Sequence, residues 1–353
     1  MLPGRYGARK VEKMRDDFWK NKKIIITGAN GFLASHLTIS LLQRQAKVTG
    51  IIKEDIPLSF LNIKLKEKKY KNLKMVKGDI VNYAFIKKVF KNYKPDVCFH
   101  LAAQAIVGSA NKSPIPTLKT NILGTWNILE AVRAYSSKTK LIVASSDKAY
   151  GEHKRLPYTE DAALQAQHPY DASKACADIL TRTYAHTYNL AATVTRCANI
   201  YGPADPNFSR IIPDTIRSIA LNKEPVIRSD GTPIRDYIYI EDVVCAYLCL
   251  AKALYLNKNN VRGEAFNFGT GKPISVLKLV RLILKLSGKN KLKPKILSKG
   301  KIKGEIDRQY LSSKKANRIL RWHCRYSLAE GLNKTLHSKY PLTRKLLSVI
   351  IVL

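Results

Sequence analysis

Short apolar runs alternate with amphipathic stretches through residue 198 of the chain. The runs are rich in β-branched residues, and the stretches between them place apolar side chains at helical spacing. The strand-like runs span residues 23–27, 47–52, 73–78, 97–101, 141–144 and 194–198. Strands that alternate with helices predict an α/β fold with a parallel, doubly wound sheet. In such sheets ligands bind at the carboxyl ends of the strands.

A glycine-rich turn directly follows the first run. It reads Gly28-Ala29-Asn30-Gly31-Phe32-Leu33-Ala34 and continues into a helical pattern. Glycines here let the backbone approach a pyrophosphate, and the helix amino terminus supplies N–H donors and a positive dipole. Ala34 takes the third glycine position, where a methyl group is tolerated. We predict a Rossmann-type dinucleotide site lined by Gly28, Asn30, Gly31, Phe32 and Leu33.

Two further strand ends carry candidate cofactor contacts. The second run ends at Lys53-Glu54-Asp55. An acid there suits the ribose 2′-hydroxyl of NAD, whereas a cation suits the 2′-phosphate of NADP. We predict NAD as the cofactor with Lys53 among its contacts, and leave NADP open. The fourth run ends in Leu101-Ala102-Ala103, where small side chains let a cofactor lie close, and His100 beside them is expected to be a core residue.

The fifth run ends in polar residues, Ser145-Ser146-Asp147-Lys148. Farther on, Tyr170 and Lys174 are four residues apart and would share one face of a helix. A cation beside a phenol stabilises the phenolate and lowers the tyrosine pKa from about 10 towards neutrality. Tyr170 is therefore the predicted base for a sugar or alcohol hydroxyl, with Lys174 as its partner.

The pattern becomes less periodic after residue 198. We divide the chain into a basic amino-terminal arm (1–20), an NAD(P)-binding domain (21–198), a smaller substrate-binding domain (199–335) and a tail (336–353). Asn121 is expected to cap the helix that follows it, residues 122–134. That helix and the one over residues 172–188 are candidates for pairing across a homodimer.

The chain is strongly basic, with 62 Lys and Arg against 26 Asp and Glu and a net charge of +36. Such an excess suits a nucleic-acid or membrane-surface binder, and also a polyanionic small ligand. The lysines are spread through almost every segment without the interleaved aromatic residues that stack bases. We therefore favour a solvated basic surface and predict no specific nucleic-acid partner.

Cysteine usage and hydropathy place the chain in the cytoplasm. The six cysteines show no Cys-x-x-Cys spacing, which indicates reduced thiols and no metal site. No amino-terminal signal pattern is present. The apolar stretch 346–353 is too short to span a bilayer, so we predict no transmembrane segment.

Several motifs together resemble the extended short-chain dehydrogenase/reductase family of NAD-dependent epimerases and dehydratases. They are the glycine turn, Asp79-Ile80, His100-Leu-Ala-Ala103, Tyr170-x-x-x-Lys174, Asn199-x-Tyr-Gly-Pro203 and Arg235-Asp-Tyr237. Within this family, Phe18-Trp19-Lys20 and Ser146-Asp147-Lys148 look most like CDP-glucose 4,6-dehydratases. The resemblance covers roughly residues 18–333.

The resemblance implies roles for these residues. Asp79 and Ile80 would flank the adenine, and Ser146 would steady the sugar hydroxyl that Tyr170 deprotonates. Lys174 would hold the ribose. The nucleotide-sugar diphosphate would be bound by Asn199, Asn207, Arg235 and Arg308. An exposed surface cation is the alternative interpretation of either arginine, and a serious one for Arg308.

Three functions remain open at this point. A nucleotide-sugar 4-epimerase needs only Ser146, Tyr170, Lys174 and a cofactor that takes and returns a hydride. A 4,6-dehydratase also needs a base at C5 and an acid at the C6 hydroxyl, which Lys148 and Asp147 supply. We prefer the dehydratase, although both side chains reach the sugar only if the strand bends there. A nucleic-acid-binding or regulatory protein on a retained fold is the non-enzyme alternative.

Overall fold

The computed structural model describes residues 17–258, 260–298, 300 and 306–339. Its centre is a parallel sheet of seven strands in the order β11-β6-β5-β4-β1-β2-β3. The strands are β1 (Lys23–Thr27), β2 (Lys47–Ile52), β3 (Leu73–Lys77), β4 (Val97–His100), β5 (Lys140–Ala144), β6 (Ala192–Cys197) and β11 (Ala265–Phe268). The predicted doubly wound α/β fold is confirmed, and every predicted run forms a strand of this sheet.

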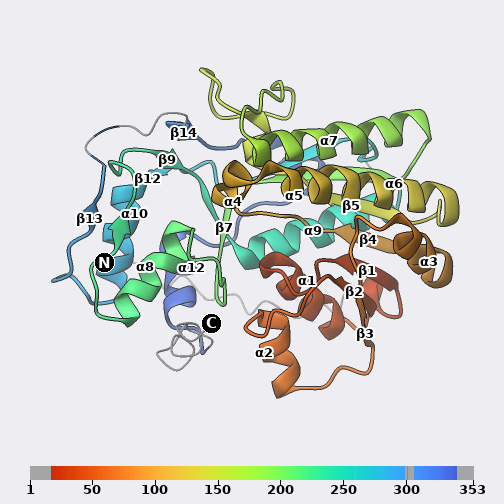
Figure 1. Cartoon of the computed structure of the whole chain (residues 1–353), viewed down its shortest axis with the longest axis horizontal. Helices are drawn as coiled ribbons and strands as arrows, with labels where there is room; N and C mark the ends of the chain where they lie inside the picture. Colours follow the sequence, from red (N-terminus) through yellow and green to blue (C-terminus); the bar gives the residue numbers. More distant parts are fainter. Residues whose placement is uncertain (1–16, 259, 299, 301–305, 340–353) are drawn as a thin grey trace, which may run out of the picture.

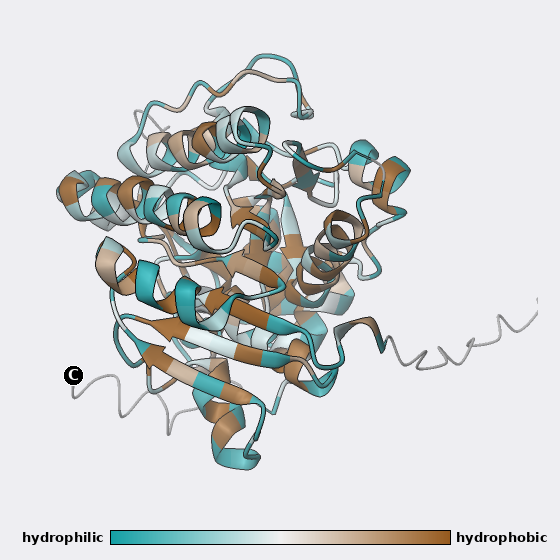
Figure 2. Ribbon diagram, turned by 90° about the vertical axis from the view of Figure 1, so that its right-hand side faces the viewer, coloured by the Kyte–Doolittle hydropathy of each residue, from teal (hydrophilic) through white to brown (hydrophobic). Residues whose placement is uncertain are grey.

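Helices cover both faces of the sheet (Figure 1). On one face α1 (Phe32–Gln43) and α9 (Ile240–Tyr255) pack into the core, and on the other α3 (Tyr83–Tyr93), α6 (Gly124–Tyr135) and α7 (Pro169–Thr187) do so. The inner strands β1, β4 and β5 are therefore largely buried and apolar, and brown segments are seen in the strands between the helices in Figure 2. The edge strand β3 and the strand β6 carry charged residues, among them Lys74 and Arg196.

After β6 the chain leaves the large sheet and later returns to it. Both α9 and β11 come from beyond residue 199, so the large sheet draws on both sides of the predicted domain boundary. The remaining strands form three small sheets, namely β7 (Asn199–Tyr201) with β10 (Tyr237–Tyr239), β9 (Ile234–Arg235) between β12 (Ile274–Ser275) and β14 (Arg308–Gln309), and β8 (Val226–Ile227) with β13 (Lys295–Ile296).

Shorter helices complete the described part of the chain. They are η1 (Asp17–Trp19), α2 (Phe60–Glu67), α4 (Val107–Lys112), α5 (Pro114–Leu118), η2 (Lys119–Leu123), η3 (Asp147–Tyr150), α8 (Ile211–Ala220), α10 (Val276–Leu286), α11 (Lys314–Leu320) and α12 (Leu328–Leu336). Most of the predicted basic arm and tail, residues 1–16 and 340–353, lies outside the described residues. Among the helices that are described, none has the length and apolarity needed to cross a bilayer.

A buried ion pair joins α7 to β6. Arg196 donates from Nε and Nη2 to the two carboxylate oxygens of Asp178, at 2.7 and 2.9 Å. Both side chains are at most 1% exposed. The Nη1 of Arg196 also donates to the Tyr150 hydroxyl at 2.7 Å. Two parallel charge-assisted bonds fix orientation as well as distance, so this pair sets how α7 lies on the sheet.

Removing the carboxylate should strongly destabilise the fold. Asp178→Asn leaves the Arg196 guanidinium buried without a counter-charge, which should lower the free energy of unfolding by about 3–5 kcal/mol. Urea denaturation measures the difference. The control is Glu67→Gln, which removes an ion pair with Lys64 at 3.0 Å on the surface and should cost less than about 1 kcal/mol. An equal loss of unfolding free energy in the two variants would contradict a larger contribution from the buried pair.

Candidate active site

A cradle for a pyrophosphate lies where β1 passes into α1. Gly28 has a φ of +67°, and a Cβ there would lie 2.8 Å from the Cα of Ala102. Only glycine fits both constraints. Gly31 is the N-cap of α1, and its backbone N–H donates to the Gly28 carbonyl at 2.8 Å. The turn thus brings backbone N–H groups to the helix amino terminus, which is the arrangement that binds phosphate.

Hydrogen bonds between buried side chains join β1, β4 and α6 behind this cradle. The Thr27 hydroxyl accepts from the backbone N–H groups of Leu101 and Ala102, at 3.1 and 3.0 Å. His100 bonds Thr27 through Nδ1 at 2.8 Å and Thr125 through Nε2 at 3.0 Å. Burial, and next the charge of Lys174, lower the pKa of His100 to about 3. The prediction that His100 is a core residue is confirmed.

The ends of β2 and β3 hold the residues predicted to meet the adenosine. Lys53 Nζ lies 3.2 Å from a carboxylate oxygen of Asp79, so the two predicted contacts form an ion pair. Asn30 reaches across from the glycine turn and donates to the Glu54 carbonyl at 2.7 Å. Ile80 is buried. The two strand ends and the turn therefore form one continuous surface.

Ser146 begins a sharp turn at the end of β5. It is the N-cap of η3, where its Oγ accepts from the Lys148 backbone N–H at 3.2 Å and donates to Asp147 Oδ1 at 3.0 Å. The strand ends at Ala144, so Asp147 and Lys148 lie on a turn rather than on alternating strand positions. The bend that the dehydratase interpretation requires is present.

Asp147 is a buried carboxyl group with an unused oxygen. Its side chain is 3% exposed, and its Oδ2 has no hydrogen-bond partner among the described residues. Burial raises the pKa of Asp147 to about 6, against smaller lowering effects of Lys148, Ser146 and Arg235. Gln309 donates from Nε2 to the Asp147 backbone carbonyl at 3.0 Å. An acid with a pKa near 6 and a free oxygen can give a proton to a bound ligand.

Helix α7 brings Tyr170 and Lys174 to the same place. Both side chains are buried, and Lys174 Nζ donates to the Ala144 carbonyl at the end of β5, at 2.9 Å. The Ser145 hydroxyl donates to the Lys174 carbonyl at 3.1 Å. Two hydrogen bonds, one donated by α7 and one accepted by it, thus attach this helix to the end of β5.

The electrostatics of this pair differ from the sequence prediction. Burial raises the pKa of Tyr170 to about 12, and Arg210 is the cation that most lowers it. Burial also lowers the pKa of Lys174 to about 8. The net shift of the Tyr170 pKa is therefore opposite to the one predicted from Lys174, because the desolvation of the phenolate outweighs the nearby charges.

The predicted substrate contacts lie in different environments. Asn199 donates to the Asp236 carbonyl at 3.1 Å, and Asn207 accepts from the Ser209 backbone N–H at 3.0 Å. Arg235 is 8% exposed, donates to the Ile234 carbonyl at 2.9 Å and acts electrostatically on Asp147. Arg308 is exposed. The structure therefore brings Arg235 close enough to Asp147 to act on its charge, and leaves Arg308 at the surface.

Sequence reasoning missed three residues that contact or influence the site. Gln309 reaches Asp147, and Arg210 acts on Tyr170. Asn121 is not a helix cap. It is buried within η2, accepts from the Gln104 backbone N–H at 2.8 Å and donates to the Ser173 hydroxyl at 2.8 Å. The helical periodicity around Asn121 gave no signal that its side chain bridges two elements.

Comparison with known proteins relates this geometry to a family. Residues 25–335 match the sequence profile of the family described as GDP-mannose 4,6 dehydratase. The chain is 33% identical over 279 residues to dTDP-D-glucose 4,6-dehydratase of Dictyostelium discoideum, covering 75% of this chain and 62% of that one. It is 32% identical over 319 residues to UDP-glucuronate 4-epimerase of Thermodesulfobacterium geofontis, covering 89% and 94%.

Solved structures of both epimerases and dehydratases are also similar to this chain. UDP-glucose 4-epimerase of Thermotoga maritima, solved with UDP-glucose, superposes with a TM-score of 0.79 at 30% identity, covering 89% of this chain and 97% of that one. dTDP-glucose 4,6-dehydratase of Bacillus anthracis, solved with NAD, gives 0.78 at 28%, covering 89% and 95%. CDP-glucose 4,6-dehydratase of Salmonella typhimurium is 27% identical over 90% of each chain.

The sequence resemblance had pointed to CDP-glucose dehydratases, but the comparisons do not single them out. They include both dehydratases and epimerases at similar identity. The chain therefore belongs to the NAD-dependent epimerase/dehydratase family of extended short-chain dehydrogenases/reductases, whose members are enzymes that act on nucleotide sugars.

Proposed function

We propose that the chain is a nucleotide-sugar 4,6-dehydratase that converts an NDP-hexose, with CDP-glucose as the leading candidate, into an NDP-4-keto-6-deoxyhexose. The observation that carries this proposal is Asp147. It is a buried carboxyl group beside Ser146, with one unpartnered oxygen among the described residues and a pKa raised to about 6. Elimination of the C6 hydroxyl as water needs such an acid, whereas epimerisation at C4 does not.

NAD is the proposed cofactor. When bound, it would supply a hydride acceptor and return the hydride to the same sugar, so that no net oxidation occurs. Gly28 and Gly31 would face its pyrophosphate, and Asp79 with Lys53 would lie by the adenosine. Lys174, at 2.9 Å from the Ala144 carbonyl, would reach the ribose. The remaining contacts proposed for it are Asn30, Phe32, Leu33, Ile80, Leu101, Ala102, Ala103 and Tyr170.

Tyr170 is the proposed base for the C4 hydroxyl. Because burial raises its pKa to about 12, the phenol begins protonated and its proton must be drawn towards a neighbour. Ser146, whose hydrogen bond lowers the Tyr170 pKa, lies between the phenol and Asp147. The sugar hydroxyl would bind where it meets both Tyr170 and Ser146.

Asp147 and Lys148 are assigned the elimination. Asp147 would protonate the departing C6 hydroxyl, and Lys148 would remove the C5 proton. Lys148 is half-buried, and its charge lowers the pKa of both Asp147 and Asp171. Because an amine removes a proton only when it is neutral, the ammonium proton of Lys148 would first pass to one of these two carboxylates.

The diphosphate is assigned to the carboxyl-terminal elements. Arg235 would bind it from beside the catalytic turn, and Arg308 from the surface, because guanidinium groups match phosphate geometry. Asn199 and Asn207 would add amide contacts. Cytidine as the base rests on the resemblance of Ser146-Asp147-Lys148 to CDP-glucose dehydratases.

A 4-epimerase is the second candidate. The chain is 32% identical to UDP-glucuronate 4-epimerase of Thermodesulfobacterium geofontis over 94% of that enzyme. Ser146, Tyr170 and Lys174 suffice for that reaction. In an epimerase Asp147 and Lys148 would have no chemical role.

Tracing hydrogen atoms distinguishes the two reactions. CDP-, UDP-, GDP- and dTDP-hexoses deuterated at C4 are incubated with the enzyme in ordinary water, and products are analysed by NMR and mass spectrometry. A dehydratase should give a 6-deoxy-4-keto product with deuterium at C6. Unlabelled substrate in heavy water should gain deuterium at C5, because that proton exchanges with solvent. Label retained at C4, with the C6 hydroxyl intact, would instead identify an epimerase.

Asp147→Asn should block elimination and also stabilise the protein. C4 oxidation should continue, so reduced cofactor accumulates and is measured by its absorbance. The folded-state pKa of about 6, raised from 3.8, means that ionised Asp147 destabilises the fold at pH above both values by about 3 kcal/mol. The variant should therefore be more stable than the wild type at pH 7, and the difference should vanish as pH falls below about 4.

Asp171→Asn is the matched control for this variant. Asp171 is another buried carboxyl group whose pKa is raised by burial, but it lies on α7 next to Tyr170. Its replacement should also stabilise the protein at pH 7 while elimination continues. Elimination by Asp147→Asn at the wild-type rate would contradict the acid role proposed for Asp147.

We also propose a homodimer built on α5, α6 and α7. These helices expose large apolar side chains at 49–63% of their full area, namely Ile115, Trp126, Ile179 and Tyr188. Exposed apolar groups of this size on neighbouring helices are typical of a protein interface. The charge excess would then remain on the other, solvated surfaces.

Ile179→Lys should convert the dimer to a monomer, because the new charge would be buried at the interface. Sedimentation equilibrium of the full chain measures the mass. Leu256→Lys, at an exposed position at the end of α9, is the control and should leave the dimer intact. A monomeric wild type, or equal dissociation of both variants, would contradict this interface.

A further inference from the structure

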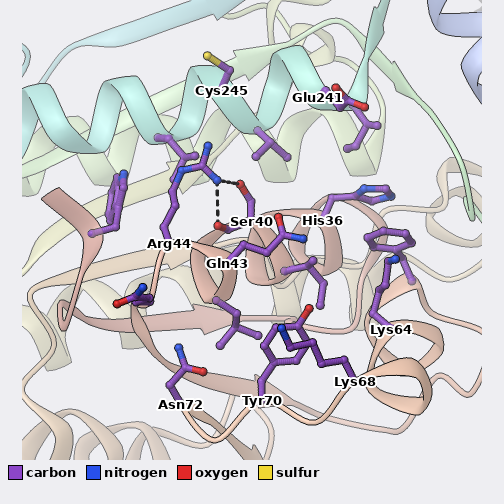
Figure 3. Close-up of a pocket in the computed structure, with 18 of the residues that line it drawn as sticks. His36, Ser40, Gln43, Arg44, Lys64, Lys68, Tyr70, Asn72, Glu241 and Cys245 are labelled. Atoms are coloured by element: carbon purple, nitrogen blue, oxygen red, sulfur yellow. Dashed lines mark hydrogen bonds between the residues drawn. The ribbon is translucent and has the colours of Figure 1, made fainter. Parts of the chain in front are cut away.

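A cavity lies away from the candidate active site. It is a groove of about 2010 Å³ between α1, α2, α9 and α12, and its lining includes none of the residues predicted to hold cofactor or sugar. Ten lysines and arginines and only two acidic residues line it. Figure 3 shows Arg44 extending from α1 towards α9, which carries Cys245. The groove is therefore a basic surface with thiols in its wall.

The two thiols are Cys245 and Cys249, one helical turn apart on α9. Both line the groove, and their sulfur atoms lie 3.9 Å apart, within reach of an S–H···S hydrogen bond. The hydrogen bond from Cys249, and next the charge of Arg325, lower the pKa of Cys245 to about 7, while the pKa of Cys249 is raised. Either sulfur can donate in this contact, and the lowered pKa together with the neighbouring arginines favours Cys245 as the thiolate.

The other cysteines have different surroundings. Burial raises the pKa of Cys98, Cys197 and Cys324. A thiolate is the nucleophile in disulfide exchange, so buried neutral thiols are inert. Cys176 is half-buried on α7, outside the groove, and provides a matched comparison.

The helix itself prevents the two cysteines from joining each other. Residues four apart on a helix have Cβ atoms roughly 5–6 Å apart. A disulfide needs about 3.5–4.5 Å between its Cβ atoms. Cys249 therefore cannot displace a group attached to Cys245 without distortion of α9, and an adduct on Cys245 would persist.

We propose that Cys245 is a thiolation site for anionic low-molecular-weight disulfides, with the basic groove as their binding surface and Cys249 as a positioning residue. The Cys245 thiolate attacks one sulfur of the disulfide, and a new S–S bond forms as the old one breaks. The other half leaves as a thiolate, which takes up a proton from solvent. One disulfide is consumed and one is made, so no further oxidant is needed.

The charge of the groove selects the reagent. Arg325 and Arg44 lower the pKa of Cys245, and although Arg325 also pairs with Asp242, ten of the twelve charged residues that line the groove are cationic. A cleft of one sign of charge raises the local concentration of ligands of the opposite sign. Negatively charged disulfides should react faster than neutral ones of similar size.

The test uses the full chain, oxidised glutathione as the anionic probe and hydroxyethyl disulfide as the neutral one. Intact mass spectrometry gives the rate and number of adducts, and peptide mapping locates them. Rates are divided by those of a cysteine-containing peptide with the same reagents. We expect one adduct on Cys245, with the anionic probe favoured on the order of tenfold at low salt and less as salt rises.

Variants separate the roles of the thiols. Cys245→Ser should abolish the adduct, and Cys176→Ser should leave it unchanged. Cys249→Ala should slow the reaction, whereas Cys249→Ser should retain the rate because its hydroxyl still donates to the thiolate. First modification of another cysteine, a Cys245–Cys249 disulfide, or equal normalised rates with both probes would overturn the proposal.

Discussion

The buried pair of Arg196 and Asp178 holds the candidate active site together. Asp178 lies on α7, eight residues after Tyr170, and Arg196 lies on β6 next to β5, the strand that Ser146 follows. Both charges are removed from water, and the lost hydration energy is offset only while the hydrogen bonds between them keep their geometry. A shift of α7 relative to β6 would therefore be costly. The pair therefore fixes the position of the helix whose side chains meet the end of β5.

Burial pushes Asp147, Tyr170 and Lys174 towards their neutral forms. It raises the pKa of Asp147 to about 6 and of Tyr170 to about 12, and lowers that of Lys174 to about 8. Neutral groups at a dry strand end can exchange protons with a bound sugar at modest cost. The same burial destabilises the fold at neutral pH through Asp147, which is the usual relation between function and stability at such sites.

Part of the net charge of +36 is concentrated in one groove. Cations gather along the groove between α1 and α9, on the face of the large sheet opposite α3, α6 and α7. Four of the ten exposed large apolar side chains among the described residues lie on or directly after α5, α6 and α7. The basic groove and these four side chains thus belong to opposite sides of the large sheet.

The sequence by itself determined six of the seven strands of the large sheet, the glycine turn and the chemical identity of Ser146, Tyr170 and Lys174, because periodicity and motif spacing are local properties. The tertiary structure alone decided which distant groups meet them. Gln309 reaches Asp147 across 162 residues of sequence, and no local pattern marks either end of that bond. The direction of the Tyr170 pKa shift was also decided there, because desolvation depends on what the folded chain packs around the phenol and not on which cation lies one helical turn away.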